Sequence, residues 1–212
     1  MTRAEAKERN RRALLDAAFQ VISRDGYRAR LDEIAERADL TTGAVYSLFG
    51  SKNGLVVALV ADYQRPYYVE IEQAVPAELD LLEAVDAFAR YYRRSCDAPD
   101  ARSVLSLQIT LLDMALHDPD LGVQLAGSIR SQENHLIALF TGRSHKGSVV
   151  TSHQAQRLTT ALRALFVGLG QGVTLGLAPG ADEQYFADTA RALASDMSLI
   201  DPVHGRGEAG QG

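Results

Sequence analysis

The chain has 212 residues, of which 46% are hydrophobic and 23% are charged, and it contains one cysteine, Cys96. This composition allows one or two domains with a substantial core. A single cysteine excludes an intramolecular disulfide and a thiolate metal cage, which favours a reducing, cytoplasmic setting. No apolar run approaches the roughly 18 residues of a membrane span, and the charged N-terminus is not expected to be a signal peptide.

The formal net charge of −5 is unevenly distributed along the chain. Residues 1–52 carry a charge of +2, and the remaining residues carry −7. Five basic residues also fall within ten positions near the N-terminus: Arg3, Lys7, Arg9, Arg11 and Arg12. This asymmetry indicates a head that meets phosphate and an acidic body that does not. The basic run alone is equally compatible with a solvated helix end.

Helical periodicity runs through almost the whole chain, and no stretch alternates convincingly as a strand would. The expected helices span residues 4–24, 31–38, 42–48, 52–75, 77–95, 101–116, 120–140, 154–177 and 182–200. Proline and aspartate mark most breaks, because proline stops one helix and aspartate caps the next. We expect residues 141–152 to form a polar loop.

The second and third expected helices frame the short turn ADLTT, residues 38–42. Ile34 gives the first of them an inner face, and Val45 and Leu48 lie on one face of the other. Leu40 is suited to plug the space between them, and Thr41 is a good N-cap. This order of features predicts a helix-turn-helix.

The opposite face of the third helix reads Thr42, Gly43, Tyr46, Ser47. Gly43 costs about 1 kcal/mol of helix propensity relative to alanine, and in return it lets the backbone approach the floor of a major groove. The free N–H groups of the helix N-terminus favour phosphate. The predicted DNA-binding residues are Arg30, Thr41, Thr42, Gly43, Ala44, Tyr46, Ser47 and Lys52. The alternative is an ordinary helical hairpin with a tolerated glycine.

This stretch closely resembles the DNA-binding head of the TetR/AcrR family of transcriptional regulators, over about residues 10–60. The resemblance rests on four segments in order: LLDAAFQVISRDGY, DEIAERADL, TTGAVYSLF and GSKNGL. Three positions depart from the family pattern. Asp39 stands where the turn usually has glycine, so either the turn differs or Asp39 is left-handed. Arg30 replaces a Ser/Thr cap, and Ser47 replaces a frequent histidine.

The resemblance implies an all-α fold with an N-terminal three-helix helix-turn-helix head and a C-terminal helical-bundle domain for ligand binding and dimerisation. We place the head at residues 1–52, the body at 53–202 and a disordered tail at 203–212. Residues 101–116 are apolar on most faces, which predicts a helix surrounded by others.

Glycines spaced by four, Gly168, Gly172 and Gly176, form a stripe of small residues in the body, and Ala164 and Thr160 continue the same line. A seam within the chain or close contact with a second chain would both explain it; a dinucleotide loop would need a preceding strand, which is missing. The resemblance implies dimerisation through the last two long helices. The predicted interface residues are Leu158, Leu162, Leu165, Gly168, Leu169, Gly172, Gly176, Phe186, Leu193 and Met197.

The resemblance also implies an effector pocket walled by the middle helices. The candidates share large apolar side chains or an amide on an apolar face: Phe88, Tyr91, Tyr92, Gln108, Leu111, Met114, Gln132, Leu136 and Phe166. They favour a largely apolar ligand with one or two polar anchors. Core aromatics with partly exposed glutamines are the alternative.

Catalysis has little support, because no histidine pair has metal-ligand spacing within a helix and no nucleophile or phosphate-loop motif occurs. We expect no metal and no cofactor. The sequence predicts a homodimeric, ligand-responsive DNA-binding regulator, more often a repressor, whose partners are an operator and a small effector. An all-α ligand carrier or enzyme with a structural hairpin is one alternative. A regulator that answers to a protein partner is another.

Overall fold

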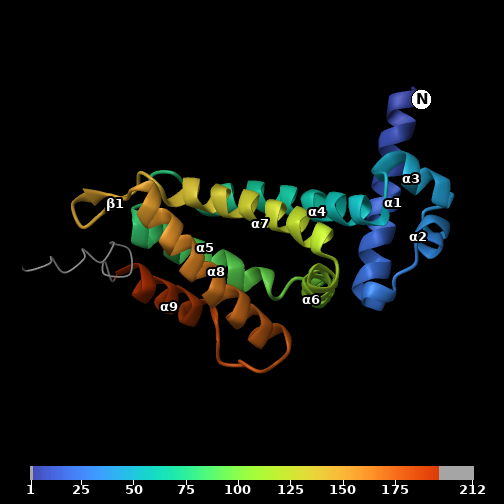
Figure 1. Ribbon diagram of the computed structural model, residues 1–212. Coiled ribbons are helices and arrows are strands. Elements are labelled where there is room, and N and C mark those ends of the chain that lie inside the picture. The colour runs from blue at the N-terminus through green and yellow to red at the C-terminus, as the bar shows by residue number, and fades with distance from the viewer. Residues whose placement is uncertain (1, 196–212) are drawn as a thin grey trace, which may run out of the picture. The chain divides into compact units, whose positions relative to one another are not determined.

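The computed structural model describes residues 2–195, except for the side chains of Tyr27, Gln64, Arg65, Pro66 and Gln132. The described chain is almost entirely helical (Figure 1). It divides into two compact units. The first contains residues up to 70 together with 97–132, and the second contains 71–96 with the described residues from 133 onward. The predicted Met197 and the predicted tail 203–212 lie outside the described residues.

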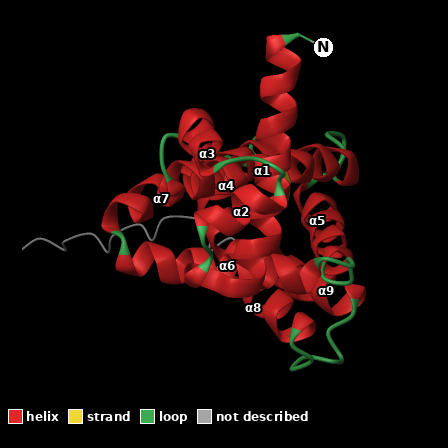
Figure 2. Ribbon diagram, turned by 90° about the vertical axis from the view of Figure 1, so that its right-hand side faces the viewer, coloured by secondary structure: helices red, strands yellow, loops and turns green. Residues whose placement is uncertain are grey.

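The first unit is built on α1 (Arg3–Asp25), the 3-10 turn η1 (Gly26–Arg28), α2 (Leu31–Arg37) and α3 (Thr42–Phe49). Most of α4 (Lys52–Ala74), α6 (Ala101–His117) and the first half of α7 (Pro119–Phe140) complete it. One core joins these elements, with buried side chains from the head and from the later helices: Leu14, Ile22, Ile34, Val45, Leu55, Leu107, Leu121 and Leu125. The N-terminal turns of α1 extend beyond its neighbours (Figure 2).

Helix α6 belongs to the same packing unit as the helix-turn-helix. It lies against α1 and η1, and the Ser106 hydroxyl donates a 2.6 Å hydrogen bond to the carbonyl of Ser23. The prediction that this helix is covered on all sides is wrong, because Ile109, Leu112 and Leu116 are exposed. An apolar composition therefore marks α6 as a packing helix without showing which of its faces are covered.

The second unit contains α5 (Leu81–Ser95), the end of α7, α8 (Ser152–Thr174) and α9 (Glu183–Ser195). Helices α5 and α9 have the most extensive contact in it. Its centre is aromatic: Phe166 stacks on Tyr92 at 5.1 Å and meets Phe88 edge-on at 5.4 Å between ring centroids. Phe140 and Phe186 extend the cluster. Aromatic pairs in these geometries add stabilisation beyond the area they bury.

Two local predictions need correction. Helix α5 begins at Leu81 instead of residue 77, because Asp80 caps it through a capping box with Glu83. The expected loop 141–152 contains a hairpin, β1 (Ser144–His145) paired antiparallel with β2 (Ser148–Val149). Its two turn residues both have positive φ, a pattern that suits a tight hairpin turn.

Burial of His145 follows from the hairpin, whereas the expected polar loop over residues 141–152 would leave this side chain in solvent. Its Nε2 has no hydrogen-bond partner, and burial lowers the pKa of its imidazole, with Lys146 nearby adding to the effect. The alternation that signals strands needs longer runs than two residues, so the sequence could not reveal this hairpin.

Among the described residues, no single helix is long and apolar enough to cross a membrane. Helices α3 and α4 pass the same test together by length and composition, although they meet at an angle of 67°.

Candidate nucleic-acid interface

The α2–turn–α3 segment has helix-turn-helix geometry. Ile34 and Ala35 bury the inner face of α2, and Leu40 packs against the same core. The Leu40 amide donates to the carbonyl of Ala35 at 2.9 Å, which closes the turn. Asp39 has φ 54, so this residue takes the left-handed conformation itself, as one of the two sequence-based alternatives required.

Helix α3 keeps one face for the core and leaves the other open. Val45 is fully buried, while Gly43 and Ser47 are exposed and Tyr46 keeps 54% of its surface. A Cβ added at Gly43 would meet nothing closer than the Thr41 hydroxyl at 3.6 Å. Gly43 is therefore not needed for packing inside the unit, which agrees with a role on the outer face.

Thr41 occupies the N-cap position of α3, as expected, but its hydroxyl does not accept a capping hydrogen bond. Thr42 is half-buried and Ala44 is partly covered, so the outward surface of α3 consists mainly of Thr41, Gly43, Tyr46 and Ser47. Amide groups at a helix N-terminus favour an anion. This surface combines a phosphate-compatible end with a slender, exposed helix face.

Two of the predicted cationic contacts have partners within the unit. Arg30 is the N-cap residue of α2 without a side-chain cap, and its guanidinium pairs with Asp32, which raises the Arg30 pKa. The Lys52 ammonium donates to the carbonyl of Ala29 at 2.7 Å, and burial lowers its pKa. Lys52 therefore ties the start of α4 to the segment that precedes α2, whether or not it also meets phosphate.

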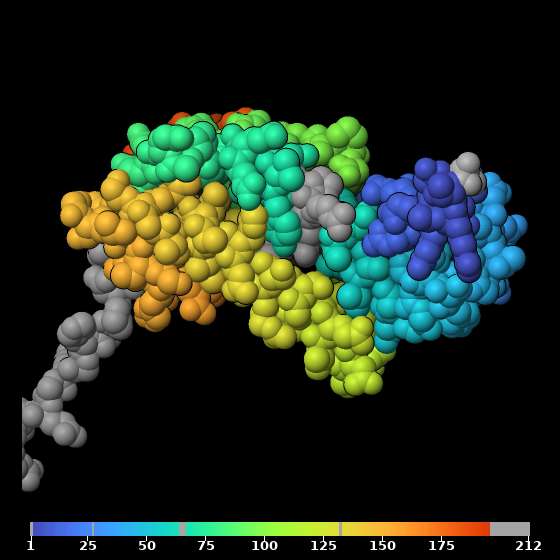
Figure 3. Space-filling view, turned by 90° about the horizontal axis from the view of Figure 1, so that it is seen from above, coloured from blue at the N-terminus to red at the C-terminus, as the bar shows by residue number. Residues whose placement is uncertain are grey.

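The basic N-terminal run does not project as one patch. Arg11 and Arg12 both lie within ion-pair distance of Asp62 on α4, with Arg12 Nη1 at 2.8 Å from Asp62 Oδ2. Residues of α1, in dark blue, lie beside the light-blue α2 and α3 segments in the space-filling view (Figure 3). Two of the five N-terminal cations thus fasten α1 to α4.

The predicted effector-pocket residues divide between the two units. Gln108, Leu111 and Met114 lie on α6 in the first unit, where Gln108 is exposed and the other two pack against the core. The second unit holds those in or beside the aromatic core: Phe88, Tyr91, Tyr92, Leu136 and Phe166. The side chain of Gln132 lies outside the described residues.

The predicted dimer residues are of two kinds. Leu158, Leu162 and Phe186 are buried within their own unit, at 2% exposure or less, and leave no area for a partner. Gly168 is exposed, and a Cβ added there would meet no other atom within 4 Å. Leu165, Leu169, Gly172 and Leu193 are partly exposed. Gly176 lies beyond the end of α8 at φ 73, so a turn explains that glycine.

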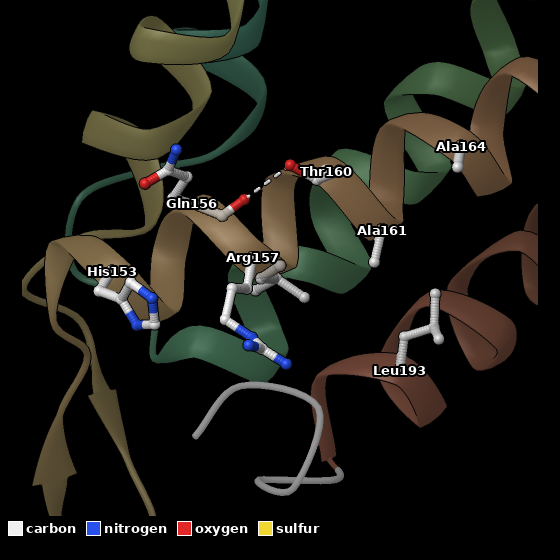
Figure 4. A pocket seen from close by; sticks show the side chains of 8 residues that line it. His153, Gln156, Arg157, Thr160, Ala161, Ala164 and Leu193 are labelled. Carbon is white, nitrogen blue, oxygen red and sulfur yellow. Dashed lines mark hydrogen bonds between the residues drawn. The ribbon is translucent and has the colours of Figure 1, made fainter. Parts of the chain in front are cut away.

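Helices α8 and α9 form an open groove of about 550 Å³ (Figure 4). Polar residues line it together with alanines and leucines: His153, Gln156, Arg157, Leu158, Thr160, Ala161, Ala164 and Leu193. The exposed residues Thr160, Ala164 and Gly168 follow one another at four-residue intervals along α8. Of the small-residue line predicted from the sequence, these three residues are exposed on α8, Gly172 is partly exposed, and Gly176 lies beyond the end of the helix.

A family model described as "Bacterial regulatory proteins, tetR family" matches residues 14–59, the segment that forms this interface. The chain is 44% identical over 66 residues to the uncharacterized HTH-type transcriptional regulator TtgW of Pseudomonas putida, covering 31% of this chain and 48% of that protein. It is 39% identical over 64 residues to the HTH-type transcriptional repressor KstR of Mycolicibacterium smegmatis, covering 29% and 31%.

Residues 14–59 of the chain are thus similar to the DNA-binding segment of TetR-family regulators. The matched region spans less than half the length of these two relatives. The names of both relatives describe transcriptional regulators.

Solved structures share the fold of this chain over nearly its whole length. A TetR-family regulator from Rhodococcus sp. has a TM-score of 0.66 at 18% identity, covering 92% of this chain and all of the other. Bacillus subtilis FadR in complex with stearoyl-CoA has a TM-score of 0.60 at 16% identity, covering 91% and 99%. At this identity the comparison concerns the fold alone.

Sequence reasoning missed residues at the junction between α3 and α4. Ser51 caps α4, since its hydroxyl accepts from the Gly54 amide at 2.9 Å. Asn53 donates to Asp118, which lies 65 positions later in the sequence. A serine three residues before a glycine at a helix start was a readable local signal, whereas the Asn53 contact depends on tertiary structure.

Proposed function

We propose that the chain is a homodimeric transcriptional regulator that binds a pseudo-palindromic operator through α3 and leaves it when a small effector binds the body. The observation that carries this proposal is the outer face of α3. Tyr46, Gly43 and Ser47 are exposed beside a fully buried Val45, in a segment that belongs to a family of bacterial regulators. A slender helix face of this kind fits a major groove. Such a regulator works in the cytoplasm, where the chromosome lies.

We infer a repressor whose effector is largely apolar. The name of KstR as a repressor and the stearoyl-CoA held by FadR support this direction. The aromatic and leucine side chains of the second unit supply suitable chemistry. Effector binding would favour a conformation in which the two heads no longer match adjacent grooves. Linkage then requires the operator to weaken effector binding by the same factor.

Dimerisation is assigned to the exposed face of α8 and α9. The stripe of Thr160, Ala164 and Gly168 lets another helix approach closely, and the adjoining groove offers a recess for its side chains. A two-fold dimer places two recognition helices about 34 Å apart, one turn of DNA. This separation predicts an operator with two related half-sites.

Tyr46→Ala is expected to lower operator affinity by about tenfold or more, because one base or phosphate contact is worth about 1–3 kcal/mol. The measurement is selection of duplexes from a random pool by the parent chain, followed by titration of the recovered operator at two salt concentrations. Tyr46→Phe separates the hydroxyl from the ring. Val149→Ala, which truncates an exposed side chain on β2 away from α3, α8 and α9, serves as the control.

A selected pseudo-palindrome with a steep salt dependence would support the proposal. Failure of the folded, ligand-stripped parent to enrich any sequence would overturn it. Unchanged operator affinity of Tyr46→Ala would instead show that a different face of α3 meets the DNA.

Gly168→Arg is expected to convert the dimer into monomers, because a long charged side chain would stand in the middle of the helix contact. Light scattering after size-exclusion chromatography gives the mass directly. Gly180→Arg introduces the same side chain at an exposed glycine with open space around it and should leave the mass unchanged. A Gly168→Arg protein that stays dimeric would place the interface elsewhere.

A further inference from the structure

Three consecutive residues at the start of α4 each contact a different part of the first unit. Lys52 reaches the carbonyl of Ala29, which precedes α2. Asn53 reaches Asp118, between α6 and α7. Gly54 lies against the carbonyl of Phe49, at the end of α3. The first turn of α4 is therefore the point where the recognition helix is held against the remainder of its unit.

The contact at Gly54 admits no side chain. A Cβ at this position would overlap the carbonyl oxygen of Phe49 and would lie 3.1 Å from its carbonyl carbon. The obstacle is backbone, so a rotamer change cannot relieve it. Any other residue must move α4 away from the end of α3, where the two helices meet at 67° across Gly50 and Ser51.

The hydrogen bond of Asn53 connects the same turn of α4 to the corner between α6 and α7. The Asn53 amide donates to Asp118 Oδ2 at 2.7 Å, and Asp118 Oδ1 accepts from the Leu121 amide at 3.0 Å. These two hydrogen bonds lower the pKa of Asp118, so its carboxylate stays charged at neutral pH. The corner that carries Asp118 is itself tight, because a Cβ at Gly122 would lie 3.0 Å from the carbonyl oxygen of Ala115.

We propose that Asn53 and Gly54 are positioning residues that fix the angle between α3 and α4, and so set operator affinity without touching DNA. This inference rests on the proposed DNA-binding function. Tyr46 lies only one helical turn before Phe49, so a displacement at the end of α3 reaches the outer face almost undiminished. Gly54 defines the closest approach of the two helices, and the bond from Asn53 to Asp118 keeps α4 at that approach.

The test combines a distance with an affinity. Nitroxide labels at Ser47→Cys on α3 and Ala61→Cys on α4, in a Cys96→Ser background, report the angle through their separation in electron paramagnetic resonance; both sites are exposed. Gly54→Ala is expected to shift this distance and, in the unlabelled chain, to weaken operator binding by about tenfold or more, as the loss of one base contact would. Gly127→Ala, on α7 with open space around it, should change neither.

Asn53→Ala removes the hydrogen bond to Asp118 and leaves the bond between Asp118 and the Leu121 amide intact. We expect a broader distance distribution and a smaller loss of affinity. If Gly54→Ala does not fold, the distance and the affinity of Asn53→Ala provide the test. A folded Gly54→Ala with the parent distance and affinity would overturn the proposal. Because the distance is measured without DNA, an unchanged distance refutes the positioning role, whereas a parent chain that binds no DNA refutes the proposed function.

Discussion

Phe166→Ala is expected to lower the free energy of unfolding of the second unit by about 3–5 kcal/mol, as for other fully buried aromatic truncations. Phe166 is 1% exposed and touches three other rings, with Tyr92 and Phe186 stacked on it and Phe88 meeting its edge. Alanine leaves a cavity at the centre of this cluster and removes all three ring contacts. Urea denaturation followed by far-UV circular dichroism measures the loss.

Phe166→Leu keeps most of the volume and should cost less than about 1.5 kcal/mol. Val149→Ala truncates a 66% exposed side chain of the same unit and should fall within about 0.5 kcal/mol of the parent. A small effect of Phe166→Ala would mean that the ring lines an open space and not a packed core. In that case its predicted contact with an effector would gain support over its structural role.

The head was largely predictable because its signals are local. Val45 and Leu48 share a face at a spacing fixed by the helix, and Asp39 and Thr41 mark turn positions that restrict backbone conformation. What the sequence could not show is that α6 and α7 complete the head core through Leu107 and Leu121. Such contacts join residues far apart in the chain, and no local periodicity encodes their partners.

The sequence predicted the helices of the body, but it did not predict what each helix face packs against. Amphipathic spacing shows that Leu158, Leu162 and Phe186 point to an apolar environment, but it does not say whether that environment is their own unit or a second chain. The structure assigns them to their own unit. The exposed small residues of α8 carry the clearer signal, since burial within the unit cannot explain Gly168.

The glycines of α8 are present for different structural reasons. Gly170 was outside the predicted stripe, yet a Cβ there would lie 3.1 Å from the ring of Tyr92 and 3.5 Å from Cys96 Sγ. This glycine lets α5 and α8 pack closely within the unit. Spacing by four identified Gly168 and Gly172 as a line, but spacing alone could not separate a packing glycine from an exposed one.

Arg143→Met is expected to destabilise the second unit by about 3 kcal/mol or more, because it removes the donors from several backbone carbonyls at once. Arg143 is 7% exposed. Its guanidinium donates to Leu139 at 2.6 Å, to Leu79 at 2.7 Å and to Pro76 at 2.9 Å. It thereby fastens the end of α7 to the loop between α4 and α5, and burial lowers its pKa.

Arg143→Lys tests whether geometry or charge provides this stability. Lysine keeps the charge but cannot present the arginine fork to carbonyls on different segments, so its stability should lie between those of the parent and the methionine variant. Arg94→Met removes an exposed arginine paired with Glu183 at 3.0 Å, and exposed pairs contribute at most about 1 kcal/mol. Equal losses for Arg143→Met and Arg94→Met in thermal unfolding would contradict the assigned role. A much larger loss for Arg143→Met would show that a residue in an apparent polar loop fastens the end of α7 to the loop between α4 and α5.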